Sequence, residues 1–301
     1  MKNILDLIGE DKYIIYGPFI EDLYTELKYW VPFLRSYYKD KDDKRFVIST
    51  RESRKDLYFN CCEPGRIITF NNVKDVQEYR ENLNLSTILS NTDYELLKSK
   101  TVETYCNVFD CFIEPKDIKH SDFNGVSFDY EFETTKNNDY FINTIMENHI
   151  NKRIICISAP LKSGSMKLWD KNKWSVLLKQ CERNKDMFFI FLGNKDTHYQ
   201  CPNNCVNAIN ISNFVNPFYD TTLLGLEIAA LKNSDFLITV VPNNTLILAY
   251  LLKVPTLFWG NKVENYLEKE NIFRTKSVGI NDTVYSCDPY VIYKHLIKNF
   301  T

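Results

Sequence analysis

Apolar and polar positions in the second half of the chain form two alternating kinds of segment. Short, nearly continuous apolar runs such as FLITVV at 236–241 are typical of strands buried on both faces of a parallel sheet. Longer segments with apolar residues every three or four positions are typical of helices. This pattern predicts strands at 153–159, 187–192, 206–211, 235–241 and 255–259, and helices at 170–184, 221–232 and 244–252. Strands that alternate with helices predict an α/β fold whose parallel sheet is covered on both faces.

The first half carries the same alternation in a weaker form. Strands are predicted at 12–19, 45–50, 66–70 and 108–115. A helix is predicted at 21–40, with a kink or break at Pro32, because proline lacks the amide hydrogen that a helix interior needs. Residues 71–100 are charged and helical in part, and 120–140 form a polar, turn-rich approach to a linker. We therefore expect two Rossmann-like domains, 1–145 and 146–301.

Composition narrows the class of protein. A chain of 301 residues with 44% hydrophobic residues is long enough for two well-packed domains. The formal charge of −2 and a pI near 6.1 give no strong nucleic-acid signature. The sequence shows neither a signal-peptide pattern nor an apolar run of membrane-spanning length, so we expect a cytoplasmic protein without a transmembrane segment.

The cysteines offer one candidate metal motif. Cys201 and Cys205 in CPNNC have the spacing of half a zinc site. No second pair and no histidine at zinc spacing completes it, so no metal is expected. Cys156 lies inside an apolar run and is expected to be a buried small hydrophobe. The four histidines, His198 among them, are expected to have no functional role.

Polar residues gather where the predicted strands of the second half lead into helices. In a parallel sheet these junctions share the carboxyl edge, where ligands bind. The candidate binding residues there are Lys162, Ser163, Gly164, Ser165, Lys167, Gly193, Asn194, Pro242, Asn243, Asn244 and Thr245, with Glu227 on the helix 221–232. We expect them to converge on one ligand.

The residue types at these junctions suit a nucleotide diphosphate. The lysines, hydroxyls and glycine of 162–167 would hold a pyrophosphate by charge-assisted hydrogen bonds and close backbone approach. The helix start at 243–245 offers amide hydrogens to a phosphate, and the carboxylate of Glu227 can accept hydrogen bonds from a ribose. Two plainer interpretations stay open: a solvated loop at 162–167, and simple helix capping at 243–245.

Several short motifs of the second half occur in a characteristic order. They are K-x-W with a later W-x-x-L, then FLG with an aspartate soon after, then L-x-E-x-A-A-L with D-F-L-I-T, and finally A-x-x-L-x-V-P-T-L-F-W-G. The set resembles the donor half of GT-B glycosyltransferases, and most of all the heptosyltransferase (ADP-heptose–lipopolysaccharide) family. The resemblance implies two Rossmann-like domains facing a central cleft. Where that family has Asp-Ser-Gly and then His, this chain has Val241, Pro242, Asn243 and later Leu246.

The start of the first half, YGPFIEDLYTEL, is similar to a G-P-F-x-G-E-x-x-x-E-L opening of relatives of these transferases. On that resemblance Asp22 takes the position of an acidic catalytic residue, Glu21 replaces a glycine, and Glu26 keeps a second acid. An inverting sugar transfer needs a base that takes the proton of the acceptor hydroxyl. The resemblance gives this role to Asp22. Alternatively, Glu21 and Asp22 are ordinary acidic residues in the first turn of a helix.

A basic cluster follows the second predicted strand of the first half. Arg51 and Arg54 suit planar, bidentate capture of a phosphate or carboxylate. We expect them to bind an anionic acceptor, or the donor phosphate across the cleft. The alternative is a solvated start of a helix.

Together, the motifs and the resemblance predict a metal-independent, inverting glycosyltransferase of hexosyl or heptosyl type without a cofactor. The expected partners are a nucleotide-sugar donor and a glycan, lipid-linked or modified-nucleobase acceptor. No Asp-x-Asp pair stands in a strand-end loop, which fits a mechanism without metal. Two alternatives stay open: a degenerate GT-B protein that binds nucleotide or glycan without turnover, and another GT-B enzyme such as a nucleotide-sugar epimerase.

Overall fold

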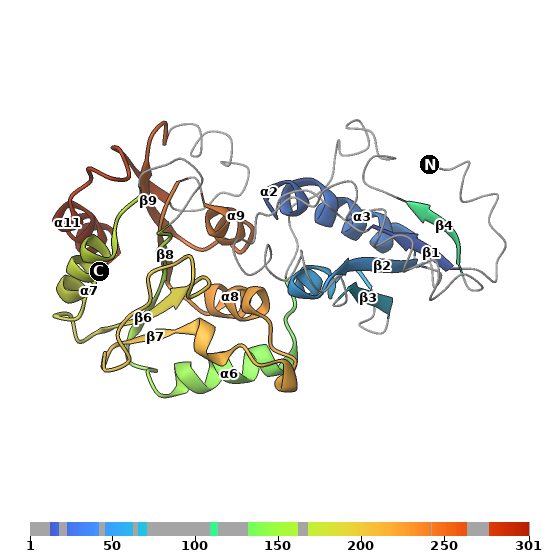
Figure 1. The fold of residues 1–301 in the computed structure, drawn as a ribbon, viewed down its shortest axis with the longest axis horizontal. Helices are drawn as coiled ribbons and strands as arrows, with labels where there is room; N and C mark the ends of the chain where they lie inside the picture. The colour runs from blue at the N-terminus through green and yellow to red at the C-terminus, as the bar shows by residue number, and fades with distance from the viewer. Residues whose placement is uncertain are drawn as a thin grey trace. The chain divides into compact units, whose positions relative to one another are not determined.

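The chain folds into two compact units, Met1–Glu133 and Thr134–Thr301. The computed structural model describes residues 13–17, 23–41, 46–62, 66–70, 109–113, 132–161, 168–241, 243–263 and 277–300. In Figure 1 the first unit carries the blue end of the colour scale, and the second unit runs from green to red. Each unit is built on its own parallel sheet, which confirms the predicted α/β fold class.

The first unit holds a four-stranded sheet in the order β3-β2-β1-β4. Its strands are β1 (Tyr13–Tyr16), β2 (Phe46–Arg51), β3 (Ile67–Phe70) and β4 (Phe109–Ile113). All neighbours pair in parallel, with Tyr16 opposite both Ile48 and Ile113. The four strands coincide with predicted ones. β2 is buried along its whole length, as expected for a strand covered on both faces.

One helical segment with a wide turn follows β1. It consists of α2 (Leu23–Thr25), a π-helical turn (Glu26–Trp30) and α3 (Val31–Lys41). In the wide turn the amide of Val31 donates to the carbonyl of Glu26, five residues back. Pro32 comes next, and its ring would clash with a carbonyl of a regular α-helix, which the wider turn relieves. The predicted kink or break is therefore a π-helical turn directly before Pro32, after which the helix continues.

The second unit is built on a six-stranded parallel sheet in the order β10-β9-β8-β5-β6-β7. The strands are β5 (Arg153–Ser158), β6 (Met187–Leu192), β7 (Ala208–Asn210), β8 (Phe236–Val240), β9 (Thr256–Gly260) and β10 (Ser277–Asn281). From β5 the chain adds β6 and β7 on one side, and from β8 it adds β9 and β10 on the other. The order therefore reverses between β5 and β8, which are paired neighbours. Open α/β sheets bind their ligands at the carboxyl edge beside such a reversal.

Helices cover both faces of this sheet (Figure 1). Alternate strand residues, such as Ile155, Phe189 and Ile238, share a core with α7 (Lys171–Cys181) and α11 (Pro289–Phe300). The residues between them point to the other face, which carries α8 (Leu223–Lys232) and α9 (Asn244–Leu251). β6 and β8 are buried along their whole length, which explains why their sequences are continuous apolar runs.

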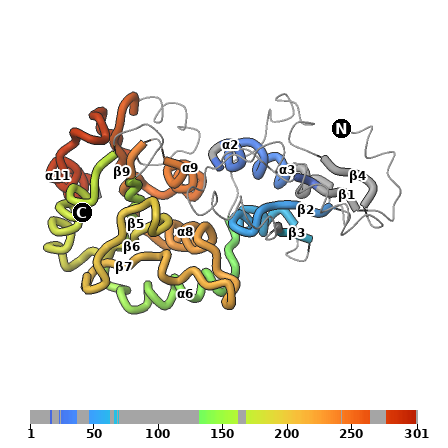
Figure 2. Tube along the Cα trace, in the orientation of Figure 1, coloured from blue at the N-terminus to red at the C-terminus, as the bar shows by residue number. Residues whose placement is uncertain are grey.

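The boundary between the units lies before helix α6 (Lys136–Glu147) and not within it. The residues of α6 belong to the second unit, so the boundary lies at 133/134, whereas the prediction put it at 145/146, inside this helix. Thr135 caps α6 by accepting a hydrogen bond from the amide of Asn138 at 3.2 Å. Ile142 and Ile145 are buried, and α6 packs against α8 (Figure 2). This helix was not predicted because its sequence, KNNDYFINTIME, is largely polar.

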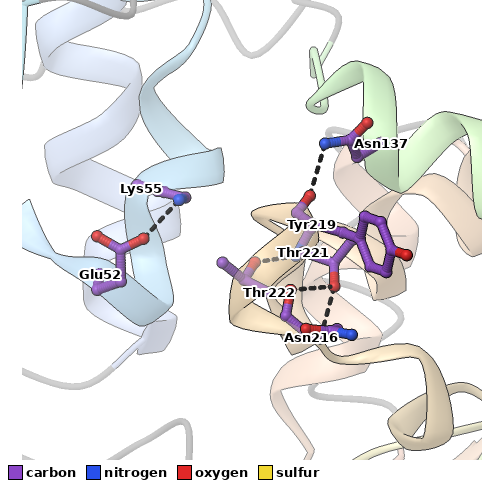
Figure 3. A network of polar contacts seen from close by, with 8 residues as sticks. Glu52, Lys55, Asn137, Asn216, Tyr219, Thr221 and Thr222 are labelled. Atoms are coloured by element: carbon purple, nitrogen blue, oxygen red, sulfur yellow. Dashed lines mark hydrogen bonds and ion pairs between the residues drawn. The ribbon is translucent and has the colours of Figure 1, made fainter.

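Hydrogen bonds attach the turn before α8 to α6 (Figure 3). The side-chain amide of Asn137 donates to the carbonyl of Tyr219 at 2.6 Å. Oγ1 of Thr221 accepts from the amide of Asn216 at 2.7 Å and donates to the carbonyl of Phe214 at 2.8 Å. These bonds fix the start of α8, the helix that carries Glu227.

Besides α6, strand β10 and helix α11 of the second unit were not predicted. β10 is a half-buried edge strand that pairs in parallel with β9, and α11 packs against α7. The prediction of partial helix at 71–100 lies outside the described residues. Within the described ranges no helix has the length and apolar character needed to cross a membrane.

Gly260, the last residue of β9, generates a stability prediction. A Cβ at this position would lie 2.5 Å from Cγ2 and 2.8 Å from the carbonyl oxygen of Val241. We expect Gly260→Ala to lower the free energy of unfolding by about 1–3 kcal/mol, because the backbone after β8 must shift. Urea unfolding measures the change, with Gly279→Ala on the half-buried edge strand as the matched control. A Gly260→Ala protein as stable as the wild type would contradict this packing.

Candidate functional site

Asn243 stands at the reversal between β5 and β8. Its Oδ1 accepts a hydrogen bond from the amide of Thr245 at 3.0 Å, which makes it the N-cap of α9. Its Nδ2 donates to Oγ of Ser158, at the end of β5, at 2.9 Å and to Oγ1 of Thr239, in β8, at 3.0 Å. The hydroxyls of Ser158 and Thr245 lie 3.1 Å apart. One side-chain amide thus joins two strands and a helix.

These contacts give part of the predicted block at 242–245 a structural role. The capping interpretation is confirmed for Asn243, whose side chain is directed into the unit. Thr245 is buried and bonded to Ser158. Asn244 is half-buried at the first position of α9. Pro242 lies outside the described residues.

Glu227 brings a carboxyl group from α8 to the end of β6. Its side chain is 1% exposed. Oε1 accepts a hydrogen bond from the amide of Gly193, the residue after β6, at 2.8 Å. Oε2 is buried and has no hydrogen-bond partner among the described residues. The structure therefore brings two predicted binding residues, Gly193 and Glu227, into direct contact.

Burial decides the protonation state of Glu227. Loss of water raises the pKa of its carboxyl from 4.5 to about 8, and the amide of Gly193 opposes that rise. The nearby thiol of Cys156, on the same face of the sheet, stays neutral because burial raises its pKa to about 12. At neutral pH most molecules therefore carry a protonated Glu227, which can donate as well as accept a hydrogen bond.

The loop after β6 brings His198 onto Gly193. Gly193 has a φ of +97°, and a Cβ there would lie 2.2 Å from Cγ of the His198 ring. Nδ1 of His198 lies 2.9 Å from Oγ1 of Thr197. Burial lowers the pKa of the imidazole to about 4, so the ring is neutral. A histidine five positions after a glycine has no sequence signature, which is why no role was predicted for it.

Asn194 shapes the same loop. Its Oδ1 accepts from the amide of Asp196 and its carbonyl accepts from the amide of His198, each at 2.8 Å. Such short-range acceptors stabilise tight turns. The amide of Leu161 donates to the carbonyl of Thr197 at 2.8 Å, so the chain after β5 starts beside this turn. The residues that follow Leu161 and were predicted to bind phosphate lie outside the described residues: Lys162, Ser163, Gly164, Ser165 and Lys167.

Glu26, predicted as a second acid of the site, is enclosed in the first unit. It is 0% exposed and forms an ion pair with Arg54, which belongs to the 3-10 helix Glu52–Tyr58 directly after β2. Tyr58 donates its hydroxyl to the other carboxylate oxygen. Burial, and then the charge of Glu26, raise the pKa of Tyr58 well above its usual value. These contacts give Glu26 a structural role, because both of its carboxylate oxygens already have partners within the unit.

Arg51 and Arg54 are interior groups as well. They are 2% and 1% exposed, so the alternative of a solvated helix start is wrong. Because Arg54 pairs with Glu26, capture of an anionic ligand by Arg54 would require this pair to open. Glu21 and Asp22 lie outside the described residues.

In the part of the chain that the structure describes, no three His, Cys, Asp or Glu side chains are grouped as metal ligands. Cys201 and Cys205 are free thiols. Burial raises their pKa values to about 11 and about 12, so both are neutral thiols at physiological pH.

Two solved structures share the fold over nearly the whole chain. The structure of a family 9 glycosyl transferase from Veillonella parvula matches with a TM-score of 0.58 and 10% identity, covering 96% of this chain and 98% of that one. ADP-heptose LPS heptosyltransferase II from E. coli matches with a TM-score of 0.56 and 11% identity, covering 95% and 98%. No family model and no curated sequence matches this chain. The likeness confirms the GT-B fold that the motif order implied.

The buried ion pair of the first unit generates a prediction about stability. We expect Arg54→Met to lower the free energy of unfolding by roughly 3–5 kcal/mol, because it leaves Glu26 buried without its cation. The double variant Glu26→Gln/Arg54→Met should recover most of that loss, since both charges are removed. Urea unfolding measures each variant, with Glu133→Gln at an exposed position as control. A double variant no more stable than Arg54→Met would contradict the pairing.

The raised pKa of Glu227 predicts a pH-dependent stability. Above pH 4.5 the unfolded chain releases this proton, whereas the folded protein keeps it to about pH 8. Because the folded state binds more protons in this window, stability falls as pH rises, by at most about 1.4 kcal/mol per pH unit. Glu227→Gln lacks this titration. Its stability relative to wild type should therefore grow with pH across the window.

Unfolding curves between these two pH values test this dependence. Glu147→Gln, on the exposed surface of α6, is the matched control and should run parallel to wild type. If the difference between wild type and Glu227→Gln stays constant with pH, Glu227 does not have a raised pKa.

Proposed function

We propose that the chain is a glycosyltransferase that moves a sugar from a nucleotide-sugar donor to an acceptor hydroxyl, without a metal and with inversion. The second unit binds the donor and the first unit binds the acceptor. Two of the solved structures that match are named as a family 9 glycosyl transferase and an ADP-heptose heptosyltransferase, which supports sugar transfer. The described cysteine side chains are free thiols, which suits a reducing, cytoplasmic compartment.

The observation that carries the proposal is the buried carboxyl of Glu227 at the carboxyl edge of the sheet. An enclosed polar atom without a partner destabilises a protein unless something else satisfies it. Oε2 has no such partner among the described residues. A ribose offers two neighbouring hydroxyls that donate and accept, and it would complete this group. The amide of Gly193 already holds the other oxygen in place.

The donor diphosphate is proposed to lie between the loop after β5 and the start of α9. Two lysines, two serines and a glycine within 162–167 supply positive charge and donors. Asn244 begins α9, where backbone amides and the helix dipole favour an anion. These groups would stabilise the negative charge that grows on the departing nucleotide diphosphate.

Asp22 is proposed to take the proton of the acceptor hydroxyl. The hydroxyl oxygen then attacks the anomeric carbon from the face opposite the diphosphate, which leaves with the bonding electron pair, so the configuration inverts. Glu26 does not share this role, because its carboxylate is held by Arg54 and Tyr58. The acceptor is a glycan, a lipid-linked sugar or a modified nucleobase, with Arg51 as a candidate contact for an anionic group.

A second candidate function is binding of nucleotide or glycan without turnover. The segment 243–246, at the start of α9, favours it. Asn243 uses both ends of its side-chain amide inside the unit, and Leu246 is a buried apolar residue. Neither offers a polar group to a sugar that leaves the diphosphate. A binding protein would retain nucleotide affinity while showing neither transfer nor donor hydrolysis.

A panel of nucleoside diphosphates and their sugar conjugates tests the proposal. Thermal shift identifies the nucleotide, and mass spectrometry then follows release of the diphosphate from the matching conjugates. Sugar transfer or slow donor hydrolysis supports the transferase. A thermal shift without release supports the binding protein. No thermal shift with any nucleotide contradicts both the transferase and a nucleotide-binding protein.

Replacement of Asp22 gives the sharpest prediction about catalysis. Asp22→Asn keeps the shape but removes the basicity, so turnover should fall by roughly 10²- to 10⁴-fold. Donor affinity, which depends on the second unit, should hardly change. Initial rates and isothermal titration measure the two quantities, and Glu21→Gln serves as the neighbouring control. An Asp22→Asn enzyme with the wild-type rate would refute the assignment.

A further inference from the structure

His198 lies against the residue that holds Glu227. A Cβ on Gly193 would fall 2.2 Å from Cγ and 2.4 Å from Cδ2 of the imidazole, so the ring lies directly on the glycine. The amide of Gly193 donates to Oε1 of Glu227 at 2.8 Å. The imidazole therefore contacts the turn whose backbone binds the Glu227 carboxyl. Gly193 is the one residue between the ring and the carboxyl.

The turn that carries His198 is also bonded to the end of β5. Pro160 and His198 form an antiparallel bridge. The amide of Leu161 donates to the carbonyl of Thr197, and the amide of Tyr199 donates to the carbonyl of Ala159, each at 2.8 Å. The same turn thus connects the strand that leads into the predicted phosphate loop with the residue that binds Glu227.

The imidazole is a neutral and fixed part of this turn. Nδ1 forms a hydrogen bond with Oγ1 of Thr197 at 2.9 Å, and the amide of His198 donates to the carbonyl of Asn194 at 2.8 Å. Burial lowers the pKa of the ring to about 4. A neutral ring can pack on a glycine, but it supplies no positive charge to the carboxyl. Its effect on Glu227 is therefore one of geometry.

We propose that His198 is a positioning residue for the carboxyl of Glu227 and acts through Gly193. The ring holds Gly193 at its φ of +97°, a conformation that suits glycine, and so directs the Gly193 amide at Oε1. With Oε1 held, Oε2 keeps a single direction. For a nucleoside ligand the consequence is selectivity for a ribose diol. This consequence rests on the proposed function, whereas the hold on Gly193 does not.

A ring that only fills space would have a different effect. Its removal would loosen the surrounding strand as a whole, because local opening spreads over contiguous segments. A positioning ring acts first on the Gly193 amide. Exchange of that amide, compared with the amides of Phe189 and Phe191 in β6, separates the two roles.

Hydrogen exchange followed by NMR in the ligand-free chain tests the hold on Gly193. We expect His198→Ala to speed exchange of the Gly193 amide by about tenfold or more, with Phe189 and Phe191 changed by less than about twofold. His198→Phe keeps a flat ring but loses the hydrogen bond to Thr197, so exchange at Gly193 should rise less than in His198→Ala. Unchanged exchange at Gly193, or an equal increase along β6, would overturn the proposal.

Thr197→Val provides a second variant if His198→Ala does not fold. It removes the hydroxyl that holds Nδ1 and keeps the shape of the side chain. Exchange at Gly193 should rise above wild type while the amides of β6 keep their rates. If Gly193 exchanges as in wild type, the ring does not hold it and the proposal fails.

Binding of ribo- and dideoxyribonucleotides tests the consequence for the ligand. Adenosine, guanosine, uridine and cytidine diphosphates are each compared with the 2′,3′-dideoxy form by isothermal titration. For one of these nucleotides, wild type should bind the ribose form more tightly than the dideoxy form, by about tenfold or more. His198→Ala should lose most of that preference, and His198→Phe, which keeps the ring, should retain more of it than His198→Ala. Full preference in His198→Ala would overturn the proposal, whereas no binding by wild type would contradict only the proposed function and leave the exchange result standing.

Discussion

The reversal of strand order between β5 and β8 is the constraint on which the second unit depends. The two strands are paired neighbours, yet their chains continue to opposite sides of the sheet. Asn243 joins them at the carboxyl edge through Ser158 and Thr239 and at the same time caps α9. The fold itself therefore explains why Asn243 and its neighbours stand at the junction of a buried strand, β8, and a buried helix, α9. The residues proposed to bind ligand at this edge depend for their positions on the link that Asn243 makes between the two strands.

Each unit contains a buried carboxyl group, Glu26 or Glu227, and the surroundings of the two groups differ. Arg54 and Tyr58 satisfy both carboxylate oxygens of Glu26. Among the described residues Glu227 has one backbone amide and no cation as partners, so burial raises its pKa until it holds a proton at neutral pH. A fully satisfied carboxylate suits a structural role. A carboxyl with one oxygen still without a partner among the described residues suits a ligand.

The sequence predicts most of the fold because buried parallel strands are continuous apolar runs. β6 and β8 are recognisable for this reason, whereas α6 was missed because its exposed face is polar and only a narrow stripe with Ile142 and Ile145 is buried. The contacts between the candidate site residues are harder to predict from the sequence. Gly193 and Glu227 were both predicted, but the pairing of Glu26 with Arg54 was not, since it joins residues 28 positions apart. Periodicity carries no information on contacts of that range.

A nucleoside diphosphate is proposed to bind at the carboxyl edge of the second unit. Hydrogen exchange followed by mass spectrometry, with and without each common nucleoside diphosphate, tests this proposal directly. Slower exchange is expected in peptides that cover 158–168, 193–199 and 243–247, with little change in peptides of the first unit, 1–133. Protection confined to the first unit, or no protection with any diphosphate at millimolar concentration, would contradict it.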